Sequence, residues 1–289
     1  MNNAISTPVV FFIFKRPDTT FRVFEKIREI KPSQLIIISD GPKNEEEKWL
    51  VDLTRDIVNR ADWDCVVDRV YSETNMGCAL RIISGLNYVF QNHEKAIILE
   101  DDCLPSSSFF SFCSELLNKY ESEEKIMHIS GCNLLGEVKI REDYFFSNYA
   151  FPPWGWATWK RAWSKYSIEI EEWNNKIEKY TKARLFSAKQ FPYWNKAIER
   201  NIQNKDTWDH QWAFALWDNK GLSIIPKCNL ISNIGFDIRG VHTRKESIYS
   251  DMKTNCISFP LNHPSIIINS KIDKKYVKLI ECFIKSLNK

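Results

Sequence analysis

The sequence predicts an α/β protein whose central sheet is mainly parallel and flanked by helices. Three apolar runs, at 8–14, 35–39 and 96–99, have the length and continuity of strands that are covered on both faces. Between them lie segments whose apolar residues recur at helical spacing, such as 19–30 and 78–91. Regular alternation of strand and helix is typical of a parallel sheet wrapped by helices.

The predicted elements follow one another through short connections. Asp18 or Thr19 can cap the first helix, and an Asp-Gly-Pro turn stops the second strand. Another helix is expected after Pro105. The first half is therefore expected to contain strands at 8–14, 35–39, 65–71 and 96–100 and helices at 19–30, 45–60 and 78–91.

Beyond residue 135 the alternation breaks down, and we expect two halves with different tasks, at 1–135 and 136–289, within one continuous domain. Nine of the 11 tryptophans lie between residues 154 and 217. Segment 164–185 has the charge of a solvated surface helix, and 208–221 resembles an amphipathic helix that ends at a glycine. A short strand is expected near 222–225.

The C-terminal segment KKYVKLIECFIKSLNK predicts an amphipathic basic helix. Apolar residues recur at 276, 280, 283 and 287, with lysines between them. Ordinary core packing is the first interpretation of this face, and peripheral contact with a membrane surface is the alternative.

Composition limits the classes of function. The 289 residues include 40 basic and 37 acidic side chains, a net charge of +3, which gives no reason to expect a nucleic-acid partner. Eight cysteines without a Cys-x-x-Cys pair favour buried free thiols in a reducing compartment over a zinc site or a disulfide framework. The N-terminal segment lacks the pattern of a secretory signal. We expect a cytoplasmic protein.

Three predicted strands end in polar residues, which are Arg16, Asp40 and the run Glu100-Asp101-Asp102. In open α/β sheets, ligands bind beyond the carboxyl ends of the strands. Three adjacent carboxylates repel one another, so they need either exposure to water or a cation. In an extended chain Glu100 and Asp102 project to one side and Asp101 to the other.

These carboxylates have two interpretations. Their oxygens suit Mg²⁺ or Mn²⁺, which completes its coordination with water and phosphate oxygens. The alternative is a solvated acidic turn that caps the following helix. A cation holding a diphosphate favours group transfer from a nucleotide-activated donor. Nucleotidyl transfer usually needs a glycine-rich loop, which FKRPDT lacks. Glycosyl transfer is therefore preferred.

Several segments resemble, in matching order, glycosyltransferases of the GT-A fold, in the branch that contains N-acetylglucosaminyltransferase I. VVFFIFKRPDTTFRVFEKI is similar to the opening strand and helix of that family, LIIISDGP to its second strand, and AIILEDDCLPSSSFFSF to its metal-binding strand. FPPWGWATWKRAW resembles its acceptor loop, and TWDHQW resembles its Trp-Asp segment. The likeness extends to about residue 245 and implies a bacterial relative.

The resemblance implies that Asp102 contacts the metal and that the other residues near the strand ends hold the donor. Arg16 has the alternative of a surface ion pair, Asp40 that of a turn former, and Asn75 that of a helix start. His242 lies in a loop that is expected to close over the donor, although a lone histidine is more often structural. The donor-binding residues implied are Arg16, Asp40, Asn75, Arg81, Glu100, Asp101 and His242.

The half at 1–135 is expected to bind the nucleotide sugar. The tryptophan-rich half at 136–289 is expected to bind the acceptor and to carry out catalysis. Indole faces pack well on sugar C–H faces, and a neighbouring glycine permits close backbone approach. Core filling is the alternative for the tryptophans. The resemblance points to Asp209 as the general base of an inverting transfer, with helix capping as its alternative and His210 as a rival base. The acceptor-binding residues implied are Trp154, Gly155, Trp156 and Trp208.

The expected function is a metal-dependent inverting hexosyl- or N-acetylhexosaminyltransferase. It would move a sugar from a nucleotide-diphosphate donor, a UDP-sugar, to a hydroxyl of a glycan or a lipid-linked glycan, with Mn²⁺ or Mg²⁺ as cofactor. Bacterial surface polysaccharide synthesis at the inner face of the membrane is the expected setting. The alternatives are a catalytically silent nucleotide-sugar or glycan-binding protein of the same fold, and a nucleotidyltransferase.

Overall fold

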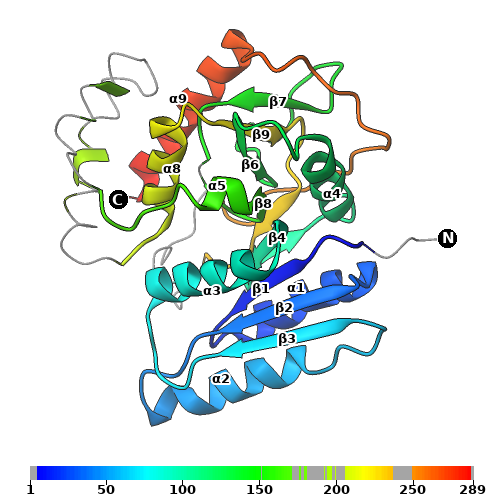
Figure 1. The fold of residues 1–289 in the computed structure, drawn as a ribbon, viewed down its shortest axis with the longest axis vertical. Coiled ribbons are helices and arrows are strands. Elements are labelled where there is room, and N and C mark those ends of the chain that lie inside the picture. The colour runs from blue at the N-terminus through cyan, green and yellow to red at the C-terminus, as the bar shows by residue number, and fades with distance from the viewer. Residues whose placement is uncertain are drawn as a thin grey trace.

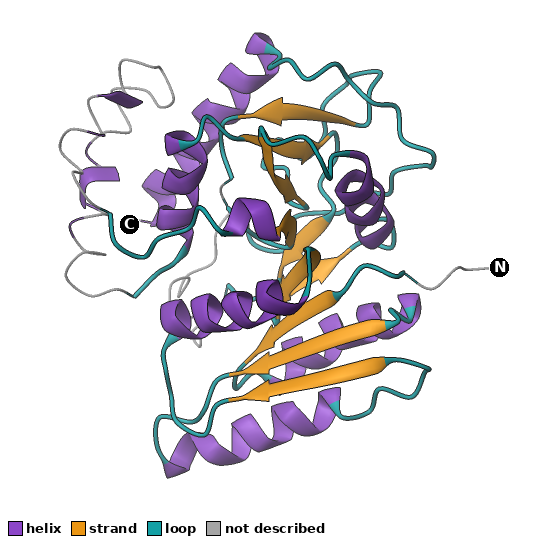
Figure 2. Cartoon of the chain, in the orientation of Figure 1, coloured by secondary structure: helices purple, strands orange, loops and turns teal. Residues whose placement is uncertain are grey.

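The centre of the molecule is an eight-stranded mixed sheet with helices on both faces (Figures 1 and 2). The structure is a computed structural model that describes residues 5–150, 152–170, 176, 179–180, 192, 194–196, 199, 206–236 and 249–287. The strands are β1 (Val9–Ile13), β2 (Gln34–Ser39), β3 (Val66–Tyr71), β4 (Lys95–Glu100), β6 (Ile126–Ser130), β7 (Tyr144–Ser147), β8 (Trp156–Trp159) and β9 (Leu222–Pro226), in the spatial order β3-β2-β1-β4-β8-β6-β9-β7.

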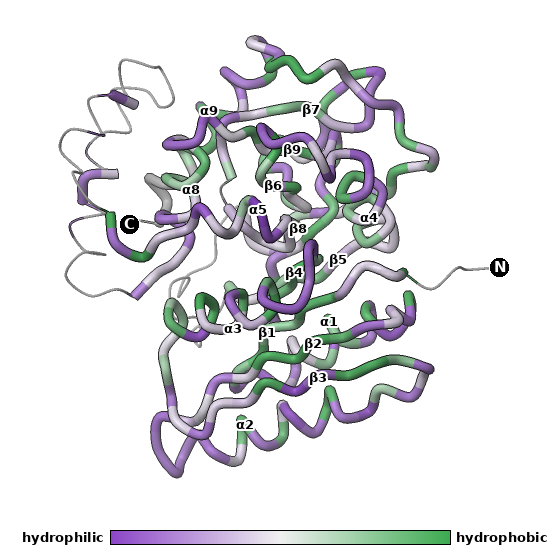
Figure 3. Tube along the Cα trace, in the orientation of Figure 1, coloured by the Kyte–Doolittle hydropathy of each residue, from purple (hydrophilic) through white to green (hydrophobic). Residues whose placement is uncertain are grey.

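Strands β3, β2, β1 and β4 pair in parallel, as the sequence predicts. Alternate residues of β1 and β2 pack against opposite layers: Phe11 and Ile37 join the core under α1 (Pro17–Ile30) and α2 (Glu45–Val58). Val10 and Ile36 join the core under α3 (Cys78–Asn92). Both faces are therefore covered, which explains why β1 and the central residues 35–38 of β2 are continuously hydrophobic (Figure 3).

The other half of the sheet corrects the expectation of a mainly parallel sheet. Strand β8 lies between β4 and β6 and runs antiparallel to both, and β7 runs antiparallel to β9. Strands β6 and β9 are parallel. The sequence assigned 156–159 to a loop, but Trp-Ala-Thr-Trp forms β8, whose position is fixed by pairing with a strand about 60 residues earlier in the chain. Sequence periodicity does not report such distant pairing.

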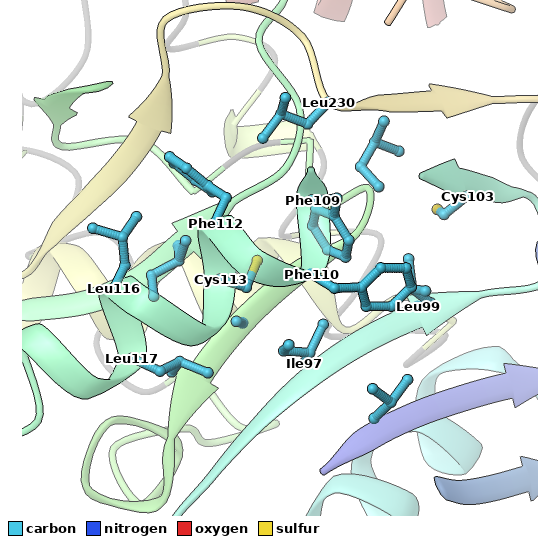
Figure 4. Packing of buried hydrophobic residues seen from close by; sticks show 14 of the residues in the cluster. Ile97, Leu99, Cys103, Phe109, Phe110, Phe112, Cys113, Leu116, Leu117 and Leu230 are labelled. Carbon is cyan, nitrogen blue, oxygen red and sulfur yellow. The ribbon is translucent and has the colours of Figure 1, made fainter. Parts of the chain in front are cut away.

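A cluster of buried apolar side chains supports the segment that follows β4. Leu99, Cys103 and Leu230 pack around α4 (Phe109–Lys119), which contributes Phe109 and Phe110 (Figure 4). Just beyond this cluster, β5 (Cys103–Pro105) pairs antiparallel with β10 (Ile231–Asn233), a small sheet that the sequence did not predict. The acidic run therefore lies between two packed strands, β4 before it in the chain and β5 after it.

The remaining helices are α5 (Lys160–Trp163), α8 (Asp209–Asp218) and α9 (Ser270–Leu287). In α9, Tyr276 and Ile280 are fully buried, which confirms core packing for the described part of its apolar face. The helix predicted at 164–185 is wrong for 164–170, which form turns and irregular chain, and most of the rest lies outside the described residues.

Two further expectations concern cysteines and membranes. All eight cysteines are free thiols, as the sequence predicts. The prediction that they are buried is confirmed for Cys103, Cys113, Cys132 and Cys228 and is wrong for the others, because Cys65 is partly exposed and Cys78, Cys256 and Cys282 are exposed. Within the described ranges, no helix combines the length and apolar character needed to cross a bilayer. The boundary at residue 135 stays a prediction, because one sheet contains strands from both halves.

Stability should depend on pH through His128, a fully buried side chain on β6 whose Nδ1 accepts a hydrogen bond of 3.2 Å from Trp212. Burial lowers the pKa of His128 to about 3. The unfolded chain therefore binds this proton at a higher pH than the native chain. Native stability is complete above about pH 6.5 and should fall by up to about 5 kcal/mol as pH falls towards 3.

Urea unfolding of the wild-type protein and His128→Asn as a function of pH measures this contribution. Asparagine keeps an acceptor for Trp212 and cannot be protonated in this range. We expect a shallower loss of stability in the variant below pH 6.5. Parallel profiles would show that His128 is not the responsible group.

Candidate functional site

The carboxyl ends of β1, β2 and β4 lie at one edge of the sheet. Phe12 is level with Glu100, and Ile13 is level with Ser39. The residues that follow these three strands therefore meet, and they include Arg16, Asp40 and the acidic run. The structure thus brings together the groups that sequence reasoning placed at the strand ends.

The acidic run is held by contacts with the segment that follows β1. The backbone N–H of Phe14 donates to Asp101 Oδ2 at 3.0 Å. Arg16 Nη1 lies 3.1 Å from Asp102 Oδ2, and both of these side chains are largely buried. A surface ion pair was the alternative for Arg16, but this pair lies within the site and joins β1 to the end of β4.

The carboxylates of this run disfavour one another's charge. Burial raises the pKa of Glu100 well above its usual range, and the negative charges of Asp102, Asp101 and Asp209 raise it further. Burial and the charge of Asp102 raise the pKa of Asp101 to about 7. Arg16 opposes both shifts. An added cation would therefore stabilise this cluster in its charged form.

Residues after β10 close over the ion pair. Ile234 donates its backbone N–H to the carbonyl oxygen of Asp102 at 2.8 Å, and Gly235 donates to Asn233 Oδ1 at 2.9 Å. A side chain at Gly235 would collide with the Asp102 carboxylate and would lie 2.6 Å from Arg16 Nη1. This glycine is required for a close approach.

Asp40 is buried, and its hydrogen bonds hold the loop before α3 in place. Its carboxylate accepts four hydrogen bonds of 2.9–3.0 Å, from the backbone N–H groups of Gly41, Met76 and Gly77 and from the Asn75 amide. A carboxylate has about four acceptor positions, so these donors occupy it. The turn-forming alternative fits Asp40, and a nucleotide contact through this carboxylate would require one donor to move.

Asn75 and Arg81 also stabilise this loop. The Asn75 amide donates to Asp40 Oδ2 and to the carbonyl of Gly41 at 2.8 Å. Arg81 is 8% exposed and donates to the carbonyl of Val70 at 2.5 Å, at the end of β3. Burial lowers the pKa of Arg81, whereas the charge of Asp40 raises it. Both side chains therefore hold the shape of the loop, and their predicted donor contacts stay predictions.

Cys78, the first residue of α3, is a member of the site that the sequence analysis missed. The thiol is solvent-accessible at the rim of the site, yet surrounding protein removes enough water to raise its pKa. The charges of Glu100, Asp209, Asp102 and Asp40 raise it further. Four carboxylates from three separate segments therefore act on one thiol. Nothing local in the sequence near Cys78 indicates this.

Asp209 lies in the first turn of α8. Its negative charge raises the pKa values of Glu100, in the acidic run, and of Cys78. Its Oδ1 accepts the backbone N–H of His210 at 3.0 Å and lies 3.2 Å from His210 Nδ1. The N-cap position is occupied by Trp208. Asp209 thus keeps a partly exposed carboxylate near the end of β4, where the helix dipole favours its charge.

The predicted acceptor residues separate into two groups. Trp154 is half-buried and packs edge-on against Phe236 at 5.5 Å between ring centroids, next to the segment that covers Asp102. Trp156 is 1% exposed and stacks on His128 at 5.3 Å and on Trp208 at 5.4 Å. Trp156 and Trp208 are therefore core residues, as their alternative interpretation held.

Gly155 has a packing role that differs from the one expected. Its φ of +56° lies in the left-handed region, and a side chain there would collide with Ile231 of β10. The close approach that this glycine permits is to the protein's own strand. His242, the last predicted donor residue, lies outside the described residues.

The donor set fits a hard divalent cation in its chemistry. Glu100 and Asp102 supply carboxylate oxygens at the edge where a diphosphate would bind, and Mg²⁺ is commonly held by one or two carboxylates with phosphate and water. Among the described residues, no group of three or more His, Cys, Asp or Glu side chains has the geometry of a metal site. A complete protein cage is therefore not present in that part, and Asp102 with Glu100 would hold the ion.

Comparisons with known proteins give weak likenesses. No family model and no curated protein matches the chain. One solved structure with a partial likeness is a UDP-glucose pyrophosphorylase complexed with UDP-glucose, with a TM-score of 0.31 and 10% identity over 55% of this chain and 78% of that chain. Another is HddC from Yersinia pseudotuberculosis, with a TM-score of 0.35 and 11% identity over 58% of this chain and 85% of that chain. A third is a 4-diphosphocytidyl-2C-methyl-D-erythritol synthase from Anaerococcus prevotii DSM 20548, with a TM-score of 0.34 and 10% identity over 60% of this chain and 84% of that chain.

These likenesses carry no argument about the activity of this chain at such TM-scores. None of the three names denotes a glycosyltransferase, and two denote enzymes of nucleotide derivatives. They do not show the predicted kinship with the N-acetylglucosaminyltransferase I branch.

Proposed function

We propose that this protein is a transferase that uses a nucleotide-diphosphate sugar and transfers the glycosyl group with inversion. One observation supports it above all: the negative charge of Asp209, at the start of α8, raises the pKa of Glu100 at the end of β4, although the two residues are 109 positions apart in the sequence. Two carboxylate groups from separate elements suit the two tasks of such a transfer, which are holding the donor and activating the acceptor.

In the proposed reaction, the acceptor hydroxyl attacks the anomeric carbon of the donor sugar from the side opposite the nucleotide. The bond between that carbon and the diphosphate oxygen breaks, a new carbon–oxygen bond forms, and the hydroxyl proton passes to Asp209. The nucleoside diphosphate leaves with the bonding electron pair. A divalent cation at Asp102 and Glu100 would offset the charge on the leaving oxygens.

The remaining described residues have supporting tasks in this proposal. Arg16 would contact the diphosphate, since guanidinium recognises phosphate oxygens in a planar, bidentate manner. Trp154 lies two residues before β8 and is only half-buried, so its ring could pack against a sugar. The proposal also includes uridine as the nucleoside of the donor and a glycan or lipid-linked glycan as the acceptor. Its proposed setting is bacterial polysaccharide synthesis, in contact with the inner face of the membrane.

Nucleotidyl transfer is the second candidate, because a divalent cation held by the acidic run at the end of β4 would serve its phosphate chemistry as well. The two reactions break different bonds of a UDP-sugar. Glycosyl transfer cleaves the bond to the anomeric carbon and yields UDP. Nucleotidyl transfer, run backwards with pyrophosphate, cleaves between the two phosphates and yields UTP and a sugar 1-phosphate.

Phosphorus NMR of a UDP-sugar panel distinguishes the two reactions. We incubate the protein with each donor and Mg²⁺, a diamagnetic ion that keeps the phosphorus signals sharp, with and without pyrophosphate. We expect slow, cation-dependent release of UDP and free sugar as water replaces the acceptor. Formation of UTP with pyrophosphate would establish nucleotidyl transfer instead. Donor binding by thermal shift without either product, even with glycan acceptors, would indicate a silent binding protein.

A further inference from the structure

Arg16 already supplies the positive charge that Asp102 would receive from a divalent cation. Nη1 lies 3.1 Å from Asp102 Oδ2, and the two side chains are 13% and 20% exposed. A guanidinium stays protonated under all ordinary conditions. The pair is therefore a permanent ion pair in a largely desolvated position, where breaking it is more costly than at the surface.

The influence of Arg16 extends over the whole acidic run. Its charge opposes the pKa increases of both Glu100 and Asp101, two side chains that the structure places beside Asp102. A cation that enters this cluster would meet the same carboxylates and also the repulsion of the guanidinium. Arg16 and a divalent cation therefore compete for one set of negative charges.

The segment after β10 keeps the ion pair in place. The backbone of Ile234 is bonded to the carbonyl of Asp102, and the backbone at Gly235 lies so close to the pair that a side chain would collide with Asp102 and come within 2.6 Å of Arg16 Nη1. The Gly235 backbone therefore crowds the side of Asp102 that carries Oδ2, the oxygen that Arg16 contacts. A cation that binds this oxygen would compete with the guanidinium for it.

We propose that Arg16 acts as a built-in competitor of the divalent cation, so that the cation binds tightly only together with the donor diphosphate. The diphosphate offers oxygens that a guanidinium binds as well as it binds a carboxylate. Transfer of Arg16 from Asp102 to the diphosphate would free Asp102 for the ion. This inference rests on the proposed function, because it needs a donor diphosphate at the same site.

Reciprocal binding measurements test this inference. Mn²⁺ binding to the full chain is followed by electron paramagnetic resonance of the free ion, with and without UDP. In the wild-type protein we expect UDP to tighten Mn²⁺ binding roughly 10- to 100-fold, and Mn²⁺ to tighten UDP binding by the same factor. In Arg16→Gln, Mn²⁺ alone should bind about tenfold more tightly, and the effect of UDP should shrink to less than about threefold.

Two further variants separate charge competition from loss of packing. Arg16→Lys keeps the positive charge, so Mn²⁺ alone should bind as weakly as in the wild-type protein. Arg22→Gln removes an exposed arginine of α1 and should leave all affinities unchanged. Circular dichroism checks that each variant is folded, and if Arg16→Gln does not fold, the comparison of Arg16→Lys with the wild type is made with UDP present and absent.

The outcomes are distinguishable. Equal Mn²⁺ affinity in Arg16→Gln and the wild-type protein, or Mn²⁺ binding to the wild-type protein that is as tight without UDP as with it, overturns the competition and leaves the proposed function standing. Absence of Mn²⁺ binding to the wild-type protein even with UDP overturns the metal site, and with it both proposals.

Discussion

Asp209→Asn should lower turnover of a UDP-sugar by roughly 10²–10⁴ while leaving donor binding nearly unchanged. The amide has almost the shape of the carboxylate, but it cannot accept the proton of the attacking hydroxyl at neutral pH. Asp209 lies on α8, whereas the groups expected to hold the donor lie at the ends of β1 and β4. The loss should therefore appear in the rate of the chemical step and not in the affinity for UDP.

Cation-dependent release of UDP and UDP affinity by calorimetry measure the two effects separately. Asp52→Asn is a matched control, since it removes an exposed carboxylate from α2 on the other side of the sheet edge. His210→Gln tests the rival base, whose Nδ1 lies 3.2 Å from Asp209 Oδ1. If His210→Gln loses more turnover than Asp209→Asn, the base is His210; if turnover survives in Asp209→Asn, that carboxylate has no part in proton transfer.

The parallel half of the fold follows from local sequence because each element there is encoded by its own pattern. The apolar runs of β1, β2 and β4 need cover on both faces, and the intervening helices supply it. Strand β8 and the small sheet of β5 and β10 depend on partners far away in the chain. Their short segments have no periodicity strong enough to distinguish a strand from a loop, so the mixed sheet could not be predicted.

The positions of the site residues could be predicted better than their tasks. A general rule about strand ends places Arg16, Asp40 and Glu100 at one edge. The hydrogen-bond donors that each carboxylate contacts depend on the paths of the loops. Only the structure shows that the Asp40 carboxylate accepts hydrogen bonds from the backbone of the loop before α3. The same holds for Trp156, because an isolated sequence cannot distinguish an indole that lines a pocket from one that fills the core.

The other large effect is expected at the opposite end of the site, where Asp102→Asn should remove the dependence of UDP binding on Mn²⁺. A carboxylate supplies the charge that a hard cation needs, and an amide oxygen supplies a much weaker ligand. The substitution also removes the carboxylate that attracts the Arg16 guanidinium at 3.1 Å, so Asp102 no longer competes with a phosphate group for this cation. UDP alone should consequently bind at least as well as in the wild-type protein, while the gain from Mn²⁺ falls at least about tenfold.

Calorimetric titration of UDP with and without Mn²⁺ measures both quantities, and Asp68→Asn on β3 serves as a control away from the site. The combination of effects is informative because a damaged fold would weaken UDP binding under both conditions. Retention of the full Mn²⁺ effect in Asp102→Asn would mean that the ion is held elsewhere, and the acidic end of β4 would then need a different explanation. A loss confined to the cation-dependent part is the result expected when a ligand of the ion is removed, and it would support Asp102 as that ligand.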